Sequence, residues 1–211
     1  MKKALALLVV SFLLIGSSYS QVKVSGGVLG GVNLANLNFS PEPTGQSFDN
    51  LTGFGVGGVL NFDFSGGFCI KAEPMYLQAG SKTTMSGVDV KLKVNYISIP
   101  ILFMYVIQTA ENQIMPYFFA GPSLGLKTGA KITGENSSAS VDVDVSDQVK
   151  STDLGAVLGA GINIPAGMNT IFLEGRYSLG LTDINNDPTT TGTIKTKGIQ
   201  FFAGILFPFG G

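Results

Sequence analysis

Histidine and tryptophan are absent from this chain of 211 residues, and cysteine occurs once, as Cys69. Without histidine the sequence excludes Ser-His-Asp and Cys-His nucleophile systems and the usual zinc ligand sets. A single cysteine excludes an intramolecular disulfide. Charged residues make up only 13% of the sequence, about half of the usual share of roughly 25%. The formal net charge of −1 is also too small to indicate nucleic-acid binding. These absences favour a protein that is not an enzyme and binds neither a cofactor nor nucleic acid.

Long hydrophobic runs are missing beyond the N-terminus. No window of about 20 apolar residues follows the first twenty positions, so no transmembrane helix is predicted. At the N-terminus, Lys2 and Lys3 precede the apolar stretch Ala4–Ile15 and then a run of small residues. This order is typical of a secretory signal peptide over residues 1–20. Residues 21–211 remain as one exported domain.

What the chain does contain is a hydrophobic period of two. In IFLEGRYSLGLTD (Ile171–Asp183) one face is apolar, and the other carries Glu174 and Arg176. Such alternation predicts a strand with one apolar and one polar face. Applied along the chain, it predicts eight strands. These strands cover Lys23–Leu37, Gly53–Phe64, Phe68–Gln78, Val94–Ile107, Pro116–Thr128, Asp153–Ile164, Ile171–Asp183 and Gly198–Phe209.

The strand lengths and connections favour a membrane barrel. Most of these strands are about twice as long as the 5 or 6 residues usual in globular proteins. The connections alternate between long and short, which is typical of outer-membrane barrels. The polar faces hold many glycines, as a narrow lumen requires. We therefore predict an all-β protein, an eight-stranded antiparallel up-and-down transmembrane β-barrel. The alternative is a soluble periplasmic lipocalin-like binding barrel, with its apolar face inside.

Several segments resemble a known family. They are YISIPILFMY (96–105), PYFFAGPSLG (116–125), GAVLGAGINI (155–164), EGRYSLGLTDIN (174–185) and IQFFAGILF (199–207). Over residues 21–209 the chain resembles the outer-membrane β-barrel domain family common in Bacteroidetes, also called PorT-like or "porin family". The resemblance implies an eight-stranded barrel of the OmpA/OmpX type in the cell outer membrane, surrounded by outer-membrane lipid. It implies little about activity. One departure is Ser98, where members of the family often carry a glutamate.

Five charged residues are predicted to face the lumen and to form a polar cluster there. They are Lys71, Glu73, Lys127, Glu174 and Arg176. Charges inside a barrel must pair or stay hydrated, so the cluster forms either a salt-bridged plug, or a gated ion path or ligand contact. An acid–base dyad of Glu73 and Glu174 lacks a nucleophile and a substrate pocket.

Three local features give further predictions. Pro100 removes a ladder donor from its strand, which predicts a bulge or bend there. The segment Ser140–Asp147 fits a calcium loop poorly and alternates strictly, so we predict a hairpin beyond the membrane and no metal site. Tyrosines are predicted to form interfacial belts in place of tryptophan. These are Tyr76, Tyr96, Tyr105, Tyr117 and Tyr177.

The function expected from the sequence is that of a non-enzymatic integral outer-membrane barrel. Its role would be structural or adhesive, or that of an accessory to a surface or secretion complex. Long loops and barrel walls would contact other envelope proteins. A small passive pore is the first alternative, which the small strand number disfavours because eight strands leave a lumen filled by side chains. The soluble binding barrel is the second.

Overall fold

The computed structural model describes residues 22–41, 48–85, 88–109, 113–135, 140–187 and 192–209. The predicted signal peptide, residues 1–20, lies outside the described residues. No helix in the described part of the chain has both the length and the apolar character that crossing a membrane requires.

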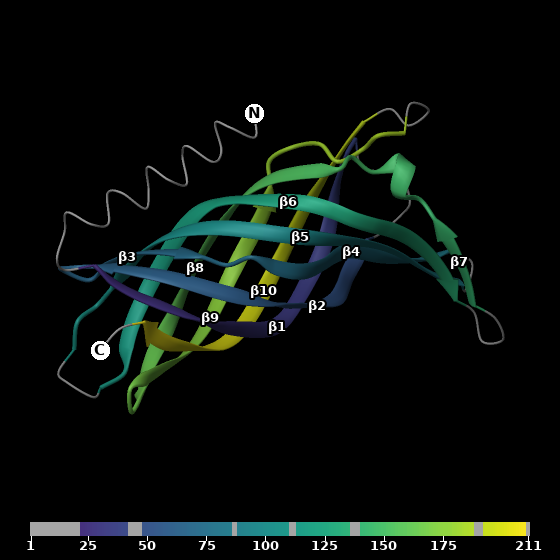
Figure 1. Ribbon diagram of the computed structural model, residues 1–211. Helices are drawn as coiled ribbons and strands as arrows, with labels where there is room; N and C mark the ends of the chain where they lie inside the picture. Colours follow the sequence, from purple (N-terminus) through teal and green to yellow (C-terminus); the bar gives the residue numbers. More distant parts are fainter. Residues whose placement is uncertain are drawn as a thin grey trace.

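The described residues form antiparallel strands that close into a barrel (Figure 1). The strands are β1 (Lys23–Ser40), β2 (Asp49–Phe64), β3 (Phe68–Ala72), β4 (Met75–Met85), β5 (Val88–Val106), β6 (Met115–Glu135), β7 (Ser140–Asp144), β8 (Thr152–Ala166), β9 (Asn169–Gly180) and β10 (Thr193–Phe209). The ring begins with β1 and β2. Its third position is shared by β3 and β4, and β5, β6, β8, β9 and β10 follow in that order. It closes because β1 pairs with both β2 and β10. The predicted eight-stranded barrel is confirmed, with β3 and β4 together forming one position of the ring.

The third predicted strand, Phe68–Gln78, is divided at Glu73 and Pro74. Pro74 has no N–H to donate to β2, although its carbonyl accepts the N–H of Gly58 at 2.9 Å. On the other side, the carbonyl of Pro100 accepts the N–H of Glu73 at 3.1 Å, and Pro100 has no N–H to return. The two missing N–H groups therefore interrupt the strand at Glu73 and Pro74. The pairings of β3 and β4 with β5 keep the same register on both sides of this gap.

The bulge predicted at Pro100 is wrong. β5 continues through Pro100, and its register with β6 is the same at Pro100, which pairs with Ser123, as at Phe103, which pairs with Ala120. The register shift lies instead at Asn95 and Tyr96. The nitrogen of Pro100 lies on the side of Glu73, where β3 has ended. The pairing of β5 with β6 skips Ile101 and Leu102, but its register does not shift there.

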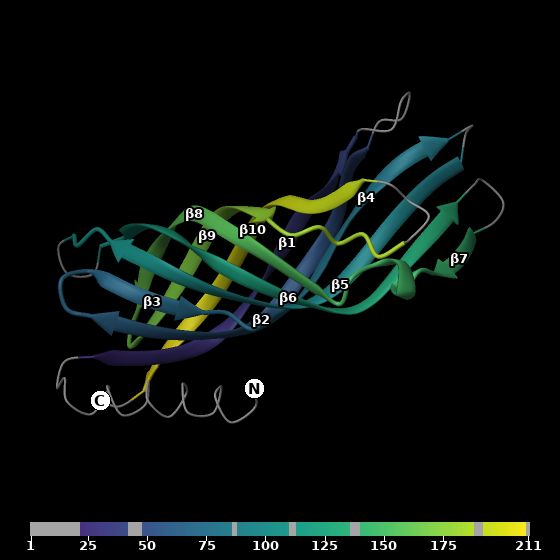
Figure 2. The same cartoon turned by 90° about the horizontal axis from the view of Figure 1, so that it is seen from above.

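The strands extend beyond the predicted boundaries at the long-loop end. Much of Ala79–Val90 and Gly129–Thr152, predicted as loops, is strand in β4, β5, β6 and β7. Figure 2 shows these strands projecting past the rest of the barrel. The predicted hairpin is present, since Ser140–Asp144 pairs with Lys131–Glu135. These strand residues were predicted as loops because they lie beyond the membrane. There neither face of the sheet must be apolar, so the hydrophobic alternation that predicts a strand is lost.

The outer wall of the barrel is apolar. Its exposed side chains include Val28, Phe54, Phe118, Leu158 and Phe201, which are between 45% and 60% exposed. A soluble barrel would turn such side chains inward. The lipocalin-like alternative is therefore wrong, because the apolar face lies outside.

Glycines on the inner wall make room for aromatic rings in the lumen. A Cβ built at each of four glycines would lie between 2.3 and 2.7 Å from a ring atom, closer than any real contact. The pairs are Gly161 with Tyr117, Gly159 with Phe119, Gly204 with Phe172 and Gly55 with Phe202. The glycines noted in the sequence thus position the rings that surround the charged centre of the lumen.

Candidate functional site

Four charged side chains meet in the lumen and form what we call the ion tetrad: Lys71, Glu73, Glu174 and Arg176. Lys71 Nζ lies 2.8 Å from Glu73 Oε1 and 2.6 Å from Glu174 Oε2. Arg176 Nη1 lies 2.7 Å from Glu73 Oε2, and Nη2 contacts Glu174 Oε1. Each cation therefore contacts both carboxylates, and all four side chains are 2% exposed or less. The tetrad is electrically neutral.

The strand period and the ring together bring these residues to one place. Lys71 and Glu73 are two positions apart, as are Glu174 and Arg176, so each pair points to the same side of its strand. The strand position of β3 and β4 is third in the ring, and that of β9 is seventh, so the two pairs come from opposite walls. The tetrad therefore spans the diameter of the lumen.

Aromatic rings enclose the tetrad. Lys71 Nζ lies 4.7 Å from the ring centroid of Phe172 and 5.5 Å from that of Tyr117. Arg176 Cζ lies 4.5 Å from the centroid of Phe202. These distances are favourable for cation–π attraction. The rings also exclude water from the charges, which strengthens their mutual attraction.

Two tyrosines predicted for the membrane interface lie inside the barrel instead. Tyr117 is 2% exposed and donates a hydrogen bond to Glu174 Oε2 at 2.9 Å. Tyr96 is 3% exposed. Both belong to the inner register of their strands, since their neighbours Phe118 and Ile97 are exposed on the outer wall. Strand phase, rather than residue type, places these two side chains.

Lys127, the fifth residue of the predicted cluster, lies elsewhere. It shares the inner register of β6 but sits closer to the long-loop end. Its Nζ donates hydrogen bonds to the backbone carbonyls of Ser146 and Val149. It therefore holds a loop segment instead of joining the tetrad.

That loop segment helps to close the mouth of the barrel. Val145, Val149 and Ile184, which we call the mouth cap, pack on inward side chains of the strands, including Val94 and Tyr96. The backbone N–H of Lys150 donates to the carbonyl of Ile184 at 2.8 Å, which joins the two loop segments. An apolar plug therefore covers the lumen at the long-loop end.

Asp183 anchors the segment that carries Ile184. Its carboxylate accepts hydrogen bonds from Lys150 Nζ at 2.8 Å and from the N–H groups of Ile194 and Asn185 at 2.8 and 3.0 Å. Burial tends to raise the pKa of this carboxyl, but the hydrogen bonds outweigh it and hold the pKa below its usual value.

Acidification is expected to loosen the mouth cap. A carboxyl whose pKa is lowered by folding contributes stability above its unfolded pKa of about 3.9, and that stability is lost as the pH falls through the folded value. We expect amide protection at Ile184 and Ile194 to fall below about pH 4. Hydrogen exchange of the protein in micelles, corrected for intrinsic rates, measures this.

Asp183→Asn is expected to show the reduced protection already at neutral pH. Asp147→Asn is the matched control, because it changes an exposed carboxyl in the other loop segment. Equal protection in wild type and Asp183→Asn would contradict the anchoring role.

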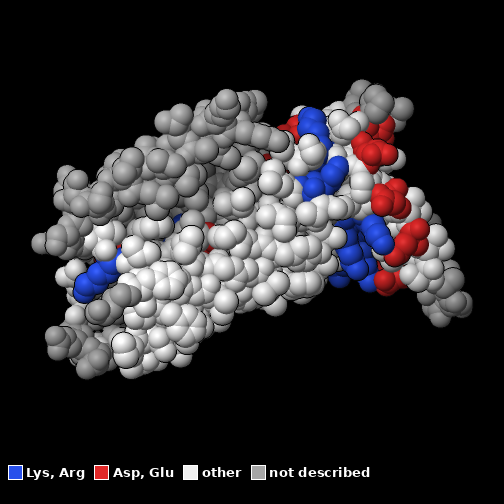
Figure 3. All heavy atoms as spheres, in the orientation of Figure 1, with Lys and Arg blue, Asp and Glu red and all other residues white. Residues whose placement is uncertain are grey.

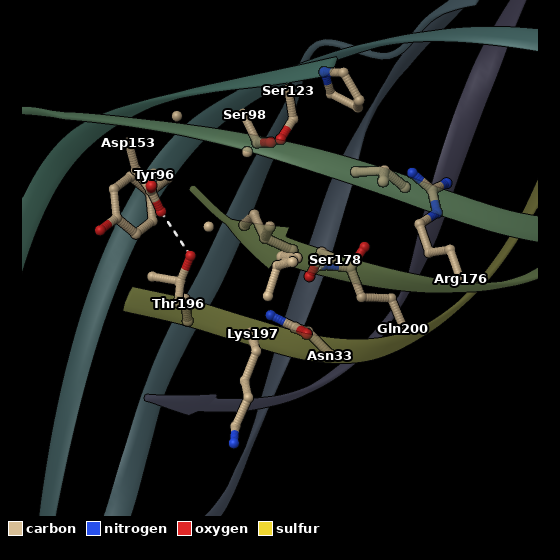
Figure 4. A pocket seen from close by; sticks show the side chains of 18 of the residues that line it. Asn33, Tyr96, Ser98, Ser123, Asp153, Arg176, Ser178, Thr196, Lys197 and Gln200 are labelled. Atoms are coloured by element: carbon tan, nitrogen blue, oxygen red, sulfur yellow. Dashed lines mark hydrogen bonds between the residues drawn. The ribbon is translucent and has the colours of Figure 1, made fainter. Parts of the chain in front are cut away.

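Two cavities lie on either side of the tetrad. The one toward the mouth cap has a volume of about 60 Å³ and is lined by polar side chains that include Ser98, Ser123 and Asp153. Figure 4 shows Tyr96 and Asp153 at one end of it and Arg176 at the other. The one toward the short turns measures about 410 Å³ and is lined by residues that include Lys71. Because the tetrad and its rings lie between them, the two cavities do not form a continuous channel.

The cavity toward the mouth has the polarity of a water site. Asp153 Oδ2 accepts a hydrogen bond from Thr196 Oγ1 at 2.6 Å, and Gln200 Nε2 donates to Ser178 Oγ at 3.1 Å. Its volume suits roughly two water molecules. It is too small for an organic substrate, for which pockets of about 300 Å³ or more are usual.

The lumen offers charges but no constellation for covalent chemistry. Within the described ranges, no three metal-ligating side chains are grouped as a metal would require. The tetrad saturates its own carboxylates with cations, so neither glutamate is positioned as a free base.

A barrel with an apolar outer wall and an ion-filled, closed lumen belongs to the class of small outer-membrane β-barrels. The chain belongs to the outer membrane protein beta-barrel domain family, whose model matches residues 19–186. It is thus an outer-membrane β-barrel protein. No curated protein matches the sequence.

Solved structures of small barrels are similar in fold. Neisserial surface protein A (NspA) has 16% identity and a TM-score of 0.49, covering 87% of this chain and 97% of its own. Ail, the attachment invasion locus protein of Yersinia pestis, has 12% identity and a TM-score of 0.42, covering 88% and 99%. OprG of Pseudomonas aeruginosa has 14% identity and a TM-score of 0.45, covering 90% and 96%.

Proposed function

We propose that this chain is a closed, non-enzymatic outer-membrane barrel that acts through its outer surfaces, in an adhesive role or as an accessory to a surface or secretion complex. The observation that carries the proposal is the blocked lumen. The ion tetrad fills its centre, and the mouth cap covers one end. A barrel that passes nothing through its lumen has its walls and its projecting strands as working surfaces. The motifs quoted from the sequence favour a Bacteroidetes-type, PorT-like member of the family.

The projecting strands β4 to β7 supply a surface of the right kind for another envelope protein. β7 pairs with β6 along one edge, and within the described residues no strand pairs with its other edge. Val141 and Val143 are 62% and 52% exposed there. Free strand edges with exposed apolar side chains bind extended segments of partner proteins by strand addition.

The blocked lumen is tested by conductance. Refolded full-length protein in a planar lipid bilayer is expected to give no steady channels, because no continuous water path crosses the tetrad. Steady, unitary openings of the wild-type protein would contradict the proposal and favour the passive pore. The same recordings on a porin of known conductance establish that insertion and detection work.

The contact surface is tested by co-purification from the outer membrane. Val141→Lys combined with Val143→Lys is expected to abolish recovery of the envelope partner, because charges block strand addition at an edge. Ser151→Lys with Thr152→Lys, also exposed and toward the long-loop end, is the matched control and is expected to keep it. Recovery of the same partner with the β7 variant would rule out this edge, and absence of any partner with wild type would rule out the accessory role.

A further inference from the structure

Four lysines gather on the outer wall at the long-loop end, where they form what we call the lysine patch: Lys82, Lys91, Lys93 and Lys131. Lys82 pairs directly with Lys91 across β4 and β5, and Lys93 pairs directly with Lys131 across β5 and β6. Lys91 and Lys93 are two positions apart on β5. The patch therefore covers three adjacent strands on one face.

The patch faces outward, away from the lumen. Val94, next to Lys93, is fully buried in the core under the mouth cap, and Ala130, next to Lys131, is 1% exposed. Ser81, next to Lys82, is 2% exposed. Since neighbouring residues of a strand point to opposite faces, the lysines lie on the outer wall.

The height of the patch follows from the outer face of β5. Reading toward the long-loop end, this face carries Phe103 and Ile97, which are 49% and 38% exposed, and then Asn95, Lys93 and Lys91. Lys93 is four residues from Ile97, which is about 13 Å along a strand. The lysines therefore follow directly on the apolar wall, at the height where lipid headgroups lie.

Carboxylates lie beside three of these lysines, but none lies opposite Lys93 on the neighbouring strands. Within the described residues, Lys91 Nζ forms a salt bridge with Glu135 Oε2 at 2.5 Å. Asp49 pairs directly with Lys82, and Asp144 with Lys131, across neighbouring strands, although neither pair forms a salt bridge. Like charges placed directly opposite each other destabilise a sheet. Figure 3 shows basic side chains between the uncharged wall and the acidic far end. An anion from outside the chain would relieve the repulsion between Lys93 and Lys131, which pair directly.

We propose that the lysine patch binds the phosphate groups of anionic lipids in the leaflet on the long-loop side. The proposal rests on the membrane placement that also underlies the proposed function, but not on the closed lumen. Phosphate groups fit because they are anionic, lie at the headgroup level and accept several hydrogen bonds from ammonium groups. A soluble phosphate lacks the acyl chains that would pack against the apolar wall beside the lysines.

The test measures lipid preference directly. Refolded full-length protein in detergent micelles receives equal amounts of phosphatidylglycerol and phosphatidylcholine, and native mass spectrometry counts the lipids retained. Wild type is expected to prefer phosphatidylglycerol. Lys93→Gln with Lys131→Gln is expected to lower that preference by about fivefold for each lysine removed. Lys23→Gln with Lys150→Gln removes the same charge outside the patch and is expected to keep the wild-type preference.

Each outcome decides the proposal. Equal retention of the two lipids by wild type, or an unchanged preference in the Lys93 and Lys131 variant, would overturn it. In a further arm, inorganic phosphate is added to the micelles that contain both lipids. If it displaced phosphatidylglycerol at equal concentration, the patch would be a site for soluble phosphate instead. A conducting barrel with an intact lipid preference would overturn only the proposed function.

Discussion

Arg176→Met is expected to lower the free energy of unfolding by about 3–5 kcal/mol, because it leaves buried charge without a partner. In the tetrad Arg176 contacts Glu73 and Glu174, and both carboxylates are fully buried. Once the guanidinium is removed, Lys71 alone faces two carboxylates. The measurement is urea unfolding of the protein refolded in lipid vesicles, followed by circular dichroism, since the chain has no tryptophan.

A second variant separates charge imbalance from lost packing. Arg176→Met combined with Glu73→Gln leaves the neutral pair of Lys71 and Glu174, so it is expected to recover most of the loss. Lys150→Gln is the control, because it breaks the exposed pair with Asp183 and is expected to cost no more than about 1 kcal/mol. If Arg176→Met were as stable as wild type, water would reach the tetrad, and the closed lumen would be disproved.

Gly204→Ala is expected to cost about 1–3 kcal/mol, as overpacking of a rigid interior does. The new Cβ would lie 2.3 Å from Cζ of Phe172 and 2.5 Å from the backbone oxygen of Val28. The ring of Phe172 cannot withdraw easily, because it lies over Lys71 in the tetrad. The same urea unfolding measures the cost.

Gly134→Ala is the matched control. It lies in a strand, and a Cβ there would meet no atom within 4 Å. Its stability is expected to match or slightly exceed that of wild type, because replacing a strand glycine reduces the entropy lost on folding. If the two variants had the same free energy of unfolding, the packing of aromatic rings against glycines would not be a source of stability.

Local features of the sequence were sufficient for the barrel and for the direction of most side chains. The alternation that sets Glu174 and Arg176 against Leu173 and Tyr177 depends only on neighbours along one strand. The membrane then turns the apolar face outward, so the charged face must line the lumen. The same alternation also places Tyr117 inside the barrel. The prediction that Tyr117 lies at the membrane interface was wrong because it used the residue type and not the position in the strand.

The extent of the strands was less predictable. Hydrophobic alternation ends where the membrane ends, but hydrogen bonding between strands continues to Met85, Val88 and Glu135. The bulge was predicted at the wrong place, Pro100, for a related reason. A missing N–H matters only on the side toward which it would point, and that side is known only once the neighbouring strands are placed.

By itself, the sequence determined the class of protein, the inward position of the four tetrad residues and the placement of glycines on the inner wall, because strand periodicity is a local property. The tertiary structure decided which charges meet. Closing the ring sets β3 and β4 opposite β9, so Lys71 and Glu73 reach Glu174 and Arg176 from the facing wall. Lys127 has the same inward phase but lies at another height, where the loops that form the mouth cap bind it. The position of a side chain along the barrel axis, and the residue that it faces across the lumen, depend on the register of every strand pair. No single segment of the sequence contains that information.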